Sequence, residues 1–279
     1  ILFSGDIGYS DRAILHDPKP PADVDIVVME TTYGDRPHKE LQPSIEELYE
    51  AITDTFARGG NVVIPSFALE RTQEILYYLR EGIEGGRLPP FMQVFLDSPM
   101  AISATEIFRR HAECYDKESE KLFLDDKDPF GFPGLHFTRD PSESMAINRI
   151  TCGAVIIAGS GMCNGGRVRH HFKQLLWREN SSVIFVGYGA TGTLARTIID
   201  GAETVKLFRE EVPVKAKIYT LGGFSAHADC NELRAWHKKT GKPEQTFLVH
   251  GEVNAMGQFA KSLDCPNIEM PELHQEFLL

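Results

Sequence analysis

The sequence predicts an α/β protein in which parallel strands are joined by helical crossovers. Short apolar runs that resemble buried strands alternate with stretches whose apolar residues recur at helical spacing. Several of these strand-like runs end in small or acidic residues, as is typical of the ligand-binding edge of a parallel sheet. The chain has 279 residues, 42% of them hydrophobic, which is enough for one large domain or two smaller ones with a substantial core.

The first part of the chain alternates regularly between strands and helices. Ser44-Ile45-Glu46-Glu47 has the form of a capping box, so we expect the first helix to begin there and Gly59-Gly60 to end it. This alternation implies parallel strands with crossover connections. Strands are expected at 1–3, 23–29, 61–66 and 91–96, and helices at 44–58, 69–80 and 100–111.

The segment 116–141 interrupts the alternation. It is rich in charge, proline and glycine, and we interpret it as a helix end, a long loop and a short strand near 135–137, a candidate flap. The pattern then resumes, and only the tail from Pro266 is weakly patterned. Strands are expected at 152–158, 182–186, 214–219 and 246–249, and helices from about 167, 193 and 231.

Composition narrows the class of protein. The formal net charge of -11 argues against a broad basic surface that coats nucleic acid, although it allows a narrow basic channel. The five cysteines are scattered and form no Cys-x-x-Cys pair, which favours free thiols in a cytoplasmic protein over a disulfide framework. No apolar run reaches the roughly 18 residues of a membrane span, so no membrane partner is expected.

The chain begins with Ile1-Leu2-Phe3, already inside an apolar strand and without an initiator methionine. We therefore expect the sequence to be a fragment of a longer protein.

Four polar residues stand at the ends of expected strands. Asp6 follows the first strand, Glu30 ends the second, and His227 and His250 follow the strands at 214–219 and 246–249. Such ends meet at one edge of a parallel sheet. Taken singly, each acid is better explained as a helix cap or a solvated loop residue.

The stretch 221–229, Leu-Gly-Gly-Phe-Ser-Ala-His-Ala-Asp, is interpreted as a strand-to-helix turn. A helix N-terminus favours anions, so the amides near Ser225 and Ala226 are candidates for binding a phosphate. His227 would stand beside it as a group that exchanges protons near neutral pH. The alternative is a turn histidine with a structural hydrogen bond.

Asp6 and His250 are candidate metal ligands, since oxygen and imidazole nitrogen suit zinc or manganese. Zinc requires at least three protein ligands, and the sequence offers no His-x-His or His-Glu-x-x-His. His170 and His171 are adjacent on a helix and point in different directions, so they form a poor chelate. The expected site is therefore incomplete.

A second candidate phosphate site is the loop Gly159-Ser160-Gly161-Met162, with Arg167 and Arg169 behind it. Small residues allow a ligand to approach the backbone closely. The alternative is a tight strand-to-helix turn with solvated arginines.

Six ordered motifs resemble those of the β-CASP ribonucleases, which belong to the metallo-β-lactamase superfamily, and the bacterial relatives look most similar. The resemblance covers essentially the whole chain. The motifs lie at 4–6 (Ser-Gly-Asp), 30–36 (Glu-Thr-Thr-Tyr-Gly-Asp-Arg), 97–100 (Asp-Ser-Pro-Met), 159–162 (Gly-Ser-Gly-Met), 224–227 (Phe-Ser-Ala-His) and 249–252 (Val-His-Gly-Glu).

The resemblance implies an α/β fold in which a β-CASP insert, a parallel sheet flanked by helices, interrupts a metallo-β-lactamase αββα core. It implies core residues at 1–34, the insert at 35–205 and the C-terminal return to the core at 206–279. The family's His-x-His-x-Asp-His run is not in this sequence. The chain thus resembles the second half of such a protein, and the missing N-terminal half of the core is an expected partner.

The resemblance also implies roles for single residues. Asp6 matches the carboxylate that bridges two zinc ions, and His250 matches an imidazole ligand of one of them. Glu30 and His227 match a catalytic pair whose histidine protonates the leaving oxygen. Because the DNA-cleaving branch has valine at the position of His250, RNA is the expected substrate.

Further residues are implied as substrate contacts. Ser225 and Ala226 match the turn that faces the substrate phosphate. Arg71, Ser160 and Gly161 are weaker candidates for contacting RNA from the insert.

Three functions remain open from the sequence. The first is a zinc-dependent RNA phosphodiester hydrolase, the second a non-catalytic RNA-binding or scaffold subunit, and the third a metallo-hydrolase with a substrate other than nucleic acid. The four site residues disfavour the second and the insert disfavours the third. The isolated chain is expected to be inactive, to carry little zinc and to be compatible with a homodimer.

Overall fold

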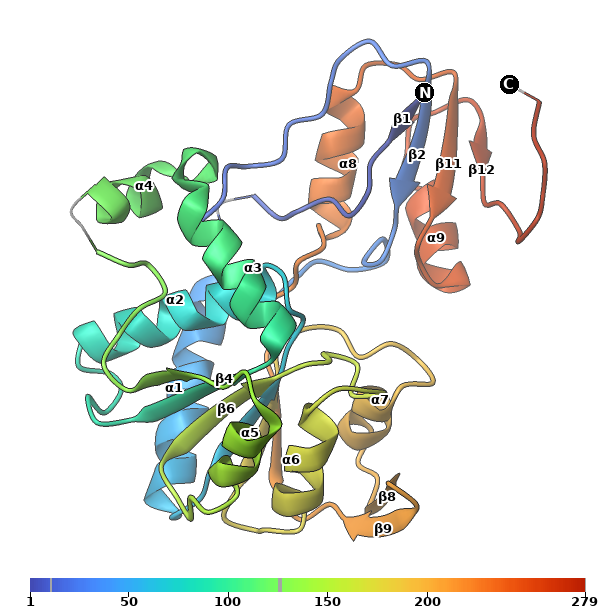
Figure 1. Ribbon diagram of the computed structural model, residues 1–279. Helices are drawn as coiled ribbons and strands as arrows, with labels where there is room; N and C mark the ends of the chain where they lie inside the picture. Colours follow the sequence, from blue (N-terminus) through green and yellow to red (C-terminus); the bar gives the residue numbers. More distant parts are fainter. Residues whose placement is uncertain (11, 125–126, 279) are drawn as a thin grey trace. The chain divides into compact units, whose positions relative to one another are not determined.

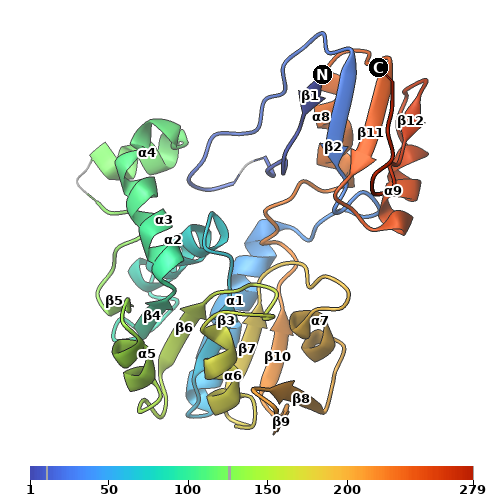
Figure 2. The same cartoon turned by 45° about the vertical axis from the view of Figure 1, so that its right-hand side comes forward.

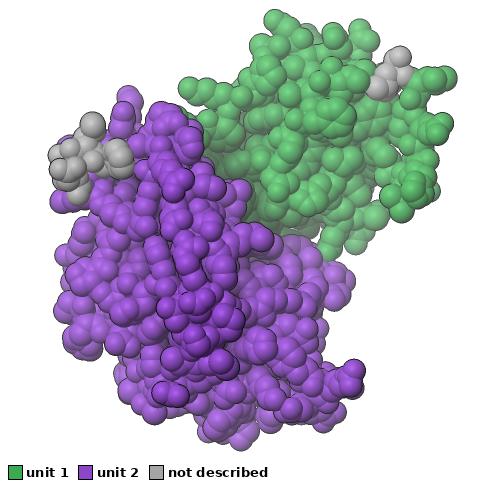
Figure 3. Space-filling model, viewed as in Figure 1, with its two compact units in different colours: residues 1–12, 16–38, 225–279 green, residues 13–15, 39–224 purple. Residues whose placement is uncertain are grey.

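The computed structural model describes residues 1–10, 12–124 and 127–278 (Figure 1). These residues form two compact units (Figure 3). The smaller unit consists of residues 1–12, 16–38 and 225–279, and the larger of residues 13–15 and 39–224. The chain therefore starts in the smaller unit, builds the larger one and returns. Apart from residues 13–15, the units change at 38/39 and 224/225, whereas the domain limits expected from the resemblance are 34/35 and 205/206.

The larger unit is built on a six-stranded sheet in the order β10-β7-β3-β6-β4-β5, in which every pair of neighbours is parallel. The predicted parallel α/β architecture is thereby confirmed. The strands are β3 (Val62–Pro65), β4 (Gln93–Asp97), β5 (Leu135–Phe137), β6 (Ala154–Ala158), β7 (Ser182–Phe185) and β10 (Lys217–Thr220).

Helices cover both faces of this sheet (Figure 2). Successive strand residues point to opposite faces, so Val62 and Ile64 belong to one core and Val63 to the other. The first core is completed by α1 (Leu41–Ala57), α2 (Arg71–Glu84) and α3 (Pro99–Arg110). The second is completed by α5 (Pro141–Ile147), α6 (Val168–Leu175) and α7 (Leu194–Ile199).

Four smaller elements complete this unit. The short helix η1 (Ala112–Cys114) precedes the expected flap, and α4 (Lys117–Leu124) lies at its start; residues 125–126 of the flap lie outside the described residues. The strands β8 (Thr204–Leu207) and β9 (Glu210–Pro213) form an antiparallel hairpin that the sequence analysis missed.

The first helix starts earlier than predicted. It begins at Leu41 with Glu40 as its N-cap residue, so Ser44 lies inside the helix and the predicted capping box is wrong. Ser44 is buried, donates to the carbonyl of Glu40 and accepts from the amide of Gly223 at 3.0 Å. A Cβ on Gly223 would lie 2.3 Å from Ser44 Oγ, so tertiary contact with a glycine backbone, not capping, explains this serine.

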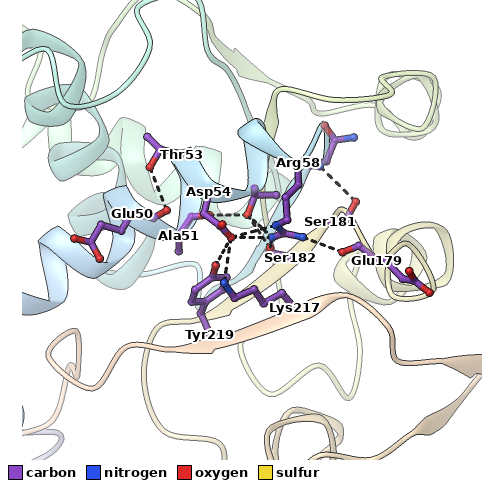
Figure 4. Close-up of polar contacts among 12 residues, drawn as sticks. Glu50, Ala51, Thr53, Asp54, Arg58, Glu179, Ser181, Ser182, Lys217 and Tyr219 are labelled. Carbon is purple, nitrogen blue, oxygen red and sulfur yellow. Dashed lines mark hydrogen bonds and ion pairs between the residues drawn. The ribbon is translucent and has the colours of Figure 1, made fainter.

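A polar network joins the C-terminal end of α1 to the edge strand β10 and its neighbour β7 (Figure 4). Asp54 accepts hydrogen bonds from Tyr219 Oη at 2.6 Å and Lys217 Nζ at 3.2 Å. The hydrogen bond from Tyr219 is the main reason that the pKa of Asp54 is lowered. Arg58 donates to Ser182 Oγ at 2.8 Å and to the carbonyl of Glu179 at 2.9 Å. These bonds attach α1 to the two strands at the β10 side of the sheet.

The smaller unit contains a four-stranded parallel sheet in the order β1-β2-β11-β12. Its core joins Val27 and Met29 of β2 and Leu248 of β11 to side chains of the two helices. The strand β12 and the helix α9 were not expected from the sequence. The elements are β1 (Leu2–Phe3), β2 (Ile26–Glu30), β11 (Gln245–Val249), β12 (Ile268–Glu269), α8 (Cys230–Lys239) and α9 (Val253–Ala260).

Within the described part of the chain, no helix combines the length and apolar character needed to cross a bilayer.

Candidate active site

Three of the four predicted site residues lie at one edge of the smaller unit's sheet. Glu30 is the last residue of β2 and pairs in register with Val249, the last residue of β11. His250 follows Val249 directly, and Asp6 follows the end of β1, which pairs with β2 on its other side. Because all these strands are parallel, their carboxyl ends share one edge, as the sequence analysis predicts.

The placement of His227 was predicted for the wrong reason. The preceding strand β10 belongs to the six-stranded sheet of the larger unit, whereas His227 and α8 belong to the smaller unit. His227 therefore lies on a connecting segment that enters the smaller unit, and not at a strand end of its sheet. Its position is fixed by loop contacts instead: the next amide, of Ala228, donates to the carbonyl of Ile7 at 2.7 Å.

His227 is paired with Glu30. Nδ1 of the imidazole lies 2.7 Å from Oε2 of the carboxylate, and the other oxygen, Oε1, accepts from the amide of Ile7 at 2.6 Å. Glu30 is 1% exposed. A buried carboxylate needs such donors because burial without partners is costly. Both carboxylate oxygens are thus held, and one of them fixes the orientation of the histidine.

Thr32 identifies the nitrogen of His227 that carries the proton. The single hydroxyl hydrogen of Thr32 is donated to the carbonyl of His250 at 3.0 Å. The hydroxyl oxygen can therefore only accept a hydrogen bond from His227 Nδ1, which lies 3.3 Å away. An ionised Glu30 also only accepts. Nδ1 therefore carries a hydrogen, and Nε2 is the nitrogen that can exchange a proton with a ligand.

Asp6 and His250 lie together beside this pair. Asp6 Oδ1 is 3.1 Å from His250 Nδ1, and the rings of His227 and His250 are 5.4 Å apart between centroids. One ligand atom from each of Asp6, His227 and His250 lies within 4.8 Å of the others. The structure thus brings the predicted ligands Asp6 and His250 together and adds His227 as a third candidate.

The chemistry and spacing of this group fit zinc. Zinc binds carboxylate oxygen and imidazole nitrogen, and two bonds of about 2.0–2.1 Å at a tetrahedral angle place the donors about 3.3 Å apart. The separation of 3.1 Å between Asp6 and His250 agrees with this spacing. Their side chains are 65% and 59% exposed, so an ion could reach them from solvent.

The backbone conformation at His250 depends on contacts with neighbouring residues. His250 has φ of +49°, in the left-handed region that is unfavourable for most residues but tolerated by histidine. Its carbonyl accepts from Thr32 Oγ1 at 3.0 Å and from the amide of Thr31 at 3.4 Å. A Cβ on Gly251 would lie 2.4 Å from Thr31 Oγ1, which explains the glycine after His250.

Two residues that hold the loop of His227 were missed by sequence reasoning. His38 Nε2 donates to the carbonyl of His227 at 2.9 Å, and the amide of His38 donates to Asp229 Oδ2 at 3.0 Å. Asp229 is also the N-cap of α8, accepting from the amides of Asn231 and Glu232. The spacing of Asp229 before the helix could have identified it as a cap, whereas His38 carries no sequence signal.

Ser225 is part of the same loop. It is buried, its hydroxyl accepts from the amide of His227 at 3.2 Å, and its carbonyl accepts from Arg12 Nη2 at 2.8 Å. Ala226 is half-buried beside it. These contacts orient His227, and the expected contact of Ser225 and Ala226 with a phosphate stays a prediction.

The other predicted substrate contacts belong to the larger unit. Arg71 is buried and forms an ion pair with Glu74 at the start of α2. Ser160 donates from its hydroxyl to the carbonyl of Gly165 at 3.2 Å, inside the loop between β6 and α6. Gly161 follows it in this loop. Their contact with RNA remains a prediction, which the burial of Arg71 makes less favourable.

Arg167 binds a buried carboxylate of the protein, whereas the sequence suggested either a phosphate-binding residue or a solvated arginine. Its Nη1 donates to Asp97 Oδ1 at 2.7 Å, and its Nη2 donates to the carbonyl of Arg139 at 2.6 Å. Burial would raise the pKa of Asp97, but hydrogen bonds from His171, Ser144 and Thr138 outweigh it and hold the pKa at about 2. Arg167 thus compensates a buried carboxylate.

Comparison with known proteins agrees with these observations. The sequence matches the family model of the Beta-Casp domain over residues 72–198. It also matches that of the Zn-dependent metallo-hydrolase RNA specificity domain over residues 211–268.

Individual relatives extend the similarity to nearly the whole chain. Ribonuclease TTHA0252 of Thermus thermophilus is 40% identical over 263 residues, covering 94% of this chain and 60% of the relative. An RNase J-like protein of Methanocaldococcus jannaschii is 32% identical over 266 residues, covering 94% and 61%. The transcription termination factor FttA of Pyrococcus horikoshii is 33% identical over 276 residues, covering 94% and 42%. The chain thus spans 42–61% of the length of these three proteins.

Proposed function

We propose, because this chain belongs to the β-CASP family of the metallo-β-lactamase superfamily, that it forms part of a zinc-dependent hydrolase of RNA phosphodiester bonds. The observation that carries the proposal is the pairing of Glu30 with His227 beside Asp6 and His250. A general acid and a group of metal ligands are the two parts that such a hydrolysis needs.

His227 serves as the proton donor to the leaving oxygen. Glu30 receives the hydrogen of Nδ1 at 2.7 Å, which fixes the ring and leaves proton transfer to Nε2. The carboxylate also stabilises the imidazolium that exists before the proton is given up. Thr32 and His38 hold the loops on either side, so the ring is oriented before substrate binds.

Asp6 and His250 serve as metal ligands. These residues would hold a zinc ion, which would supply an activated water and neutralise negative charge on the phosphodiester. With His227 serving as the proton donor, the grouped described residues leave two metal donors, Asp6 and His250, which are fewer than the three that zinc needs for one ion and too few for the two ions that the resemblance implies. We therefore propose that further donors come from outside the grouped residues of this chain, and that the chain alone holds only part of the metal site.

The proposed domain organisation follows the limits that the resemblance implies: core residues at 1–34, the β-CASP insert at 35–205 and the returning core at 206–279. Support comes from the two matched family models, which fall inside the second and third of these ranges. Homodimer formation is a further prediction, which light scattering can test.

Cleavage of a labelled single-stranded RNA tests the proposal. The chain expressed with any sequence that its gene encodes before Ile1 should cleave the RNA, lose activity in EDTA and regain it with zinc. The chain alone should cleave at background level. EDTA-sensitive cleavage by the chain alone would show that its metal site is complete, and tight RNA binding without cleavage by the longer protein would favour the non-catalytic scaffold.

A further inference from the structure

Phe67 is a large apolar side chain exposed at the carboxyl edge of the six-stranded sheet. It lies two residues after the end of β3 and is 51% exposed. The carboxyl edge of a parallel α/β sheet is where such proteins bind their ligands. An exposed phenylalanine at this edge contributes little hydrophobic free energy to folding, so a role in ligand binding would explain its position.

The loop holds Phe67 rigidly. The carbonyl of Phe67 accepts from Thr72 Oγ1 at 2.6 Å and from Ser66 Oγ at 3.1 Å. The amide of Ser66 donates to the carbonyl of Ala158, at the end of the neighbouring strand β6, at 3.0 Å. The ring is therefore carried by a backbone that is bonded to the sheet, which reduces the entropy cost of binding a ligand on it.

The ring also touches the loop that follows β6. A Cβ on Gly161 would lie 2.8 Å from Cδ2 and Cε2 of Phe67, so glycine is the residue that lets the ring approach the backbone there. Gly161 is next to Ser160, in the loop already considered for phosphate contacts. An exposed ring and a loop of small residues thus lie side by side on one unit.

The charge of the chain bears on what such a ring can bind. The formal net charge is -11, so a polyanion such as RNA gains little from the overall electrostatic field. Proteins that bind single strands add affinity by stacking bases on aromatic side chains, which does not depend on charge. We propose that Phe67 is a stacking platform for an unpaired nucleobase of single-stranded RNA. This inference rests on the proposed function, and it names a specific contact for it.

The chain offers a matched control. Phe91 is 83% exposed and lies two residues before β4, at the amino edge of the same sheet. Because β3 and β4 both pair in parallel with β6, the two phenylalanines stand at opposite edges. Phe91→Ala removes an exposed aromatic ring without touching the proposed platform.

The test measures binding of a fluorescein-labelled oligouridine of about 12 nucleotides by anisotropy. Phe67→Ala and Phe67→Leu should weaken binding about tenfold, whereas Phe67→Tyr and Phe91→Ala should bind like the wild type. The salt dependence should be the same for all variants, since no phosphate contact is removed. An oligomer with abasic positions should bind weakly and equally to the wild type and Phe67→Ala.

Three outcomes would overturn the inference. Equal loss in Phe67→Ala and Phe91→Ala, or full affinity in Phe67→Leu, would mean that the ring does not stack a base. A change in oligomeric state in Phe67→Ala with unchanged RNA affinity would assign the ring to self-association. If the wild type bound no RNA of any kind, the proposed function would fail together with this contact, a result distinct from failure of the variants alone.

Discussion

Oε2 of Glu30 lies 2.7 Å from Nδ1 of His227, although 197 positions separate the two residues in the sequence. The bond joins the end of a strand to a loop that enters the smaller unit from the larger one. Because Glu30 is buried, this carboxylate has few other ways to satisfy its charge. The pair is thus the point at which fold and proposed chemistry depend on each other.

Glu30→Gln should separate the contribution of Glu30 to folding from its contribution to proton transfer by His227. Glutamine keeps the size of the side chain and can still accept a hydrogen bond, but it cannot stabilise an imidazolium at Nδ1. RNA cleavage by the longer protein should therefore fall by about 100-fold or more, within the range of general acid catalysis. The measurement is the single-turnover rate, with the melting temperature as control for folding. An unchanged rate would remove His227 from the role of acid.

Gly251→Ala should destabilise the smaller unit. The new Cβ would lie 2.4 Å from Thr31 Oγ1 and 2.7 Å from the carbonyl oxygen of Thr31. Overpacking of this kind costs about 1–3 kcal/mol in the free energy of unfolding, measurable by urea denaturation. Gly257→Ala is the matched control, because nothing lies within 4 Å of its Cβ and it stands inside α9, where alanine is favoured.

His237 should make stability depend on pH. It is buried, its Nε2 lies 2.8 Å from Thr246 Oγ1, and burial lowers its pKa from the usual 6.5. The unfolded state then binds more protons than the folded state just below pH 6.5, so stability should be lost as the pH falls below that value. Melting temperatures between about pH 5 and 8 should show a shallower decline for His237→Gln than for the wild type. Parallel curves would contradict this.

Asp97→Asn should destabilise the larger unit strongly. The carboxylate is fully buried and accepts from Arg167 and from three further side chains, so its loss leaves the guanidinium without a counter-charge. Breaking a buried pair from one side costs about 3–5 kcal/mol. The pKa of about 2 is below the usual 3.8, so this stabilisation is present above pH 3.8 and is lost as the pH falls toward 2.

The matched control is Asp200→Asn, since Asp200 pairs with Arg196 on the exposed surface and should matter little. Equal urea midpoints for Asp97→Asn and the wild type would contradict the structural role of the buried network.

The parallel sheets and three of the four site residues could be predicted from the sequence because their signal is local. Apolar runs that end in Asp6, Glu30 and His250 identify both the strands and the edge at which they meet. The same logic misplaced His227, because adjacent segments of the chain join different sheets there. No local pattern reports where a chain passes from one unit to the other.

The missed elements have separate causes. The hairpin of β8 and β9 turns at Phe208 and Arg209, with φ of +51° and +71°, where glycine or asparagine would have given the usual signal. The helix α5 was readable, since Asp140 and Glu143 form a capping box with Pro141 at the first position. At Ser44 the same motif was misleading, because the hydroxyl of Ser44 accepts a hydrogen bond from the amide of the distant Gly223 instead of capping the helix.

The central claim is that Asp6 and His250 bind zinc while His227 transfers a proton. A zinc titration of the chain and of its Asp6→Ala and His227→Asn variants tests it most directly, with bound metal measured by elemental analysis. The account predicts weak zinc binding, well below one ion per chain, that is the same for the wild type and His227→Asn and at least about tenfold weaker for Asp6→Ala. Loss of zinc from His227→Asn to the same extent as from Asp6→Ala, or two ions per wild-type chain, would contradict it.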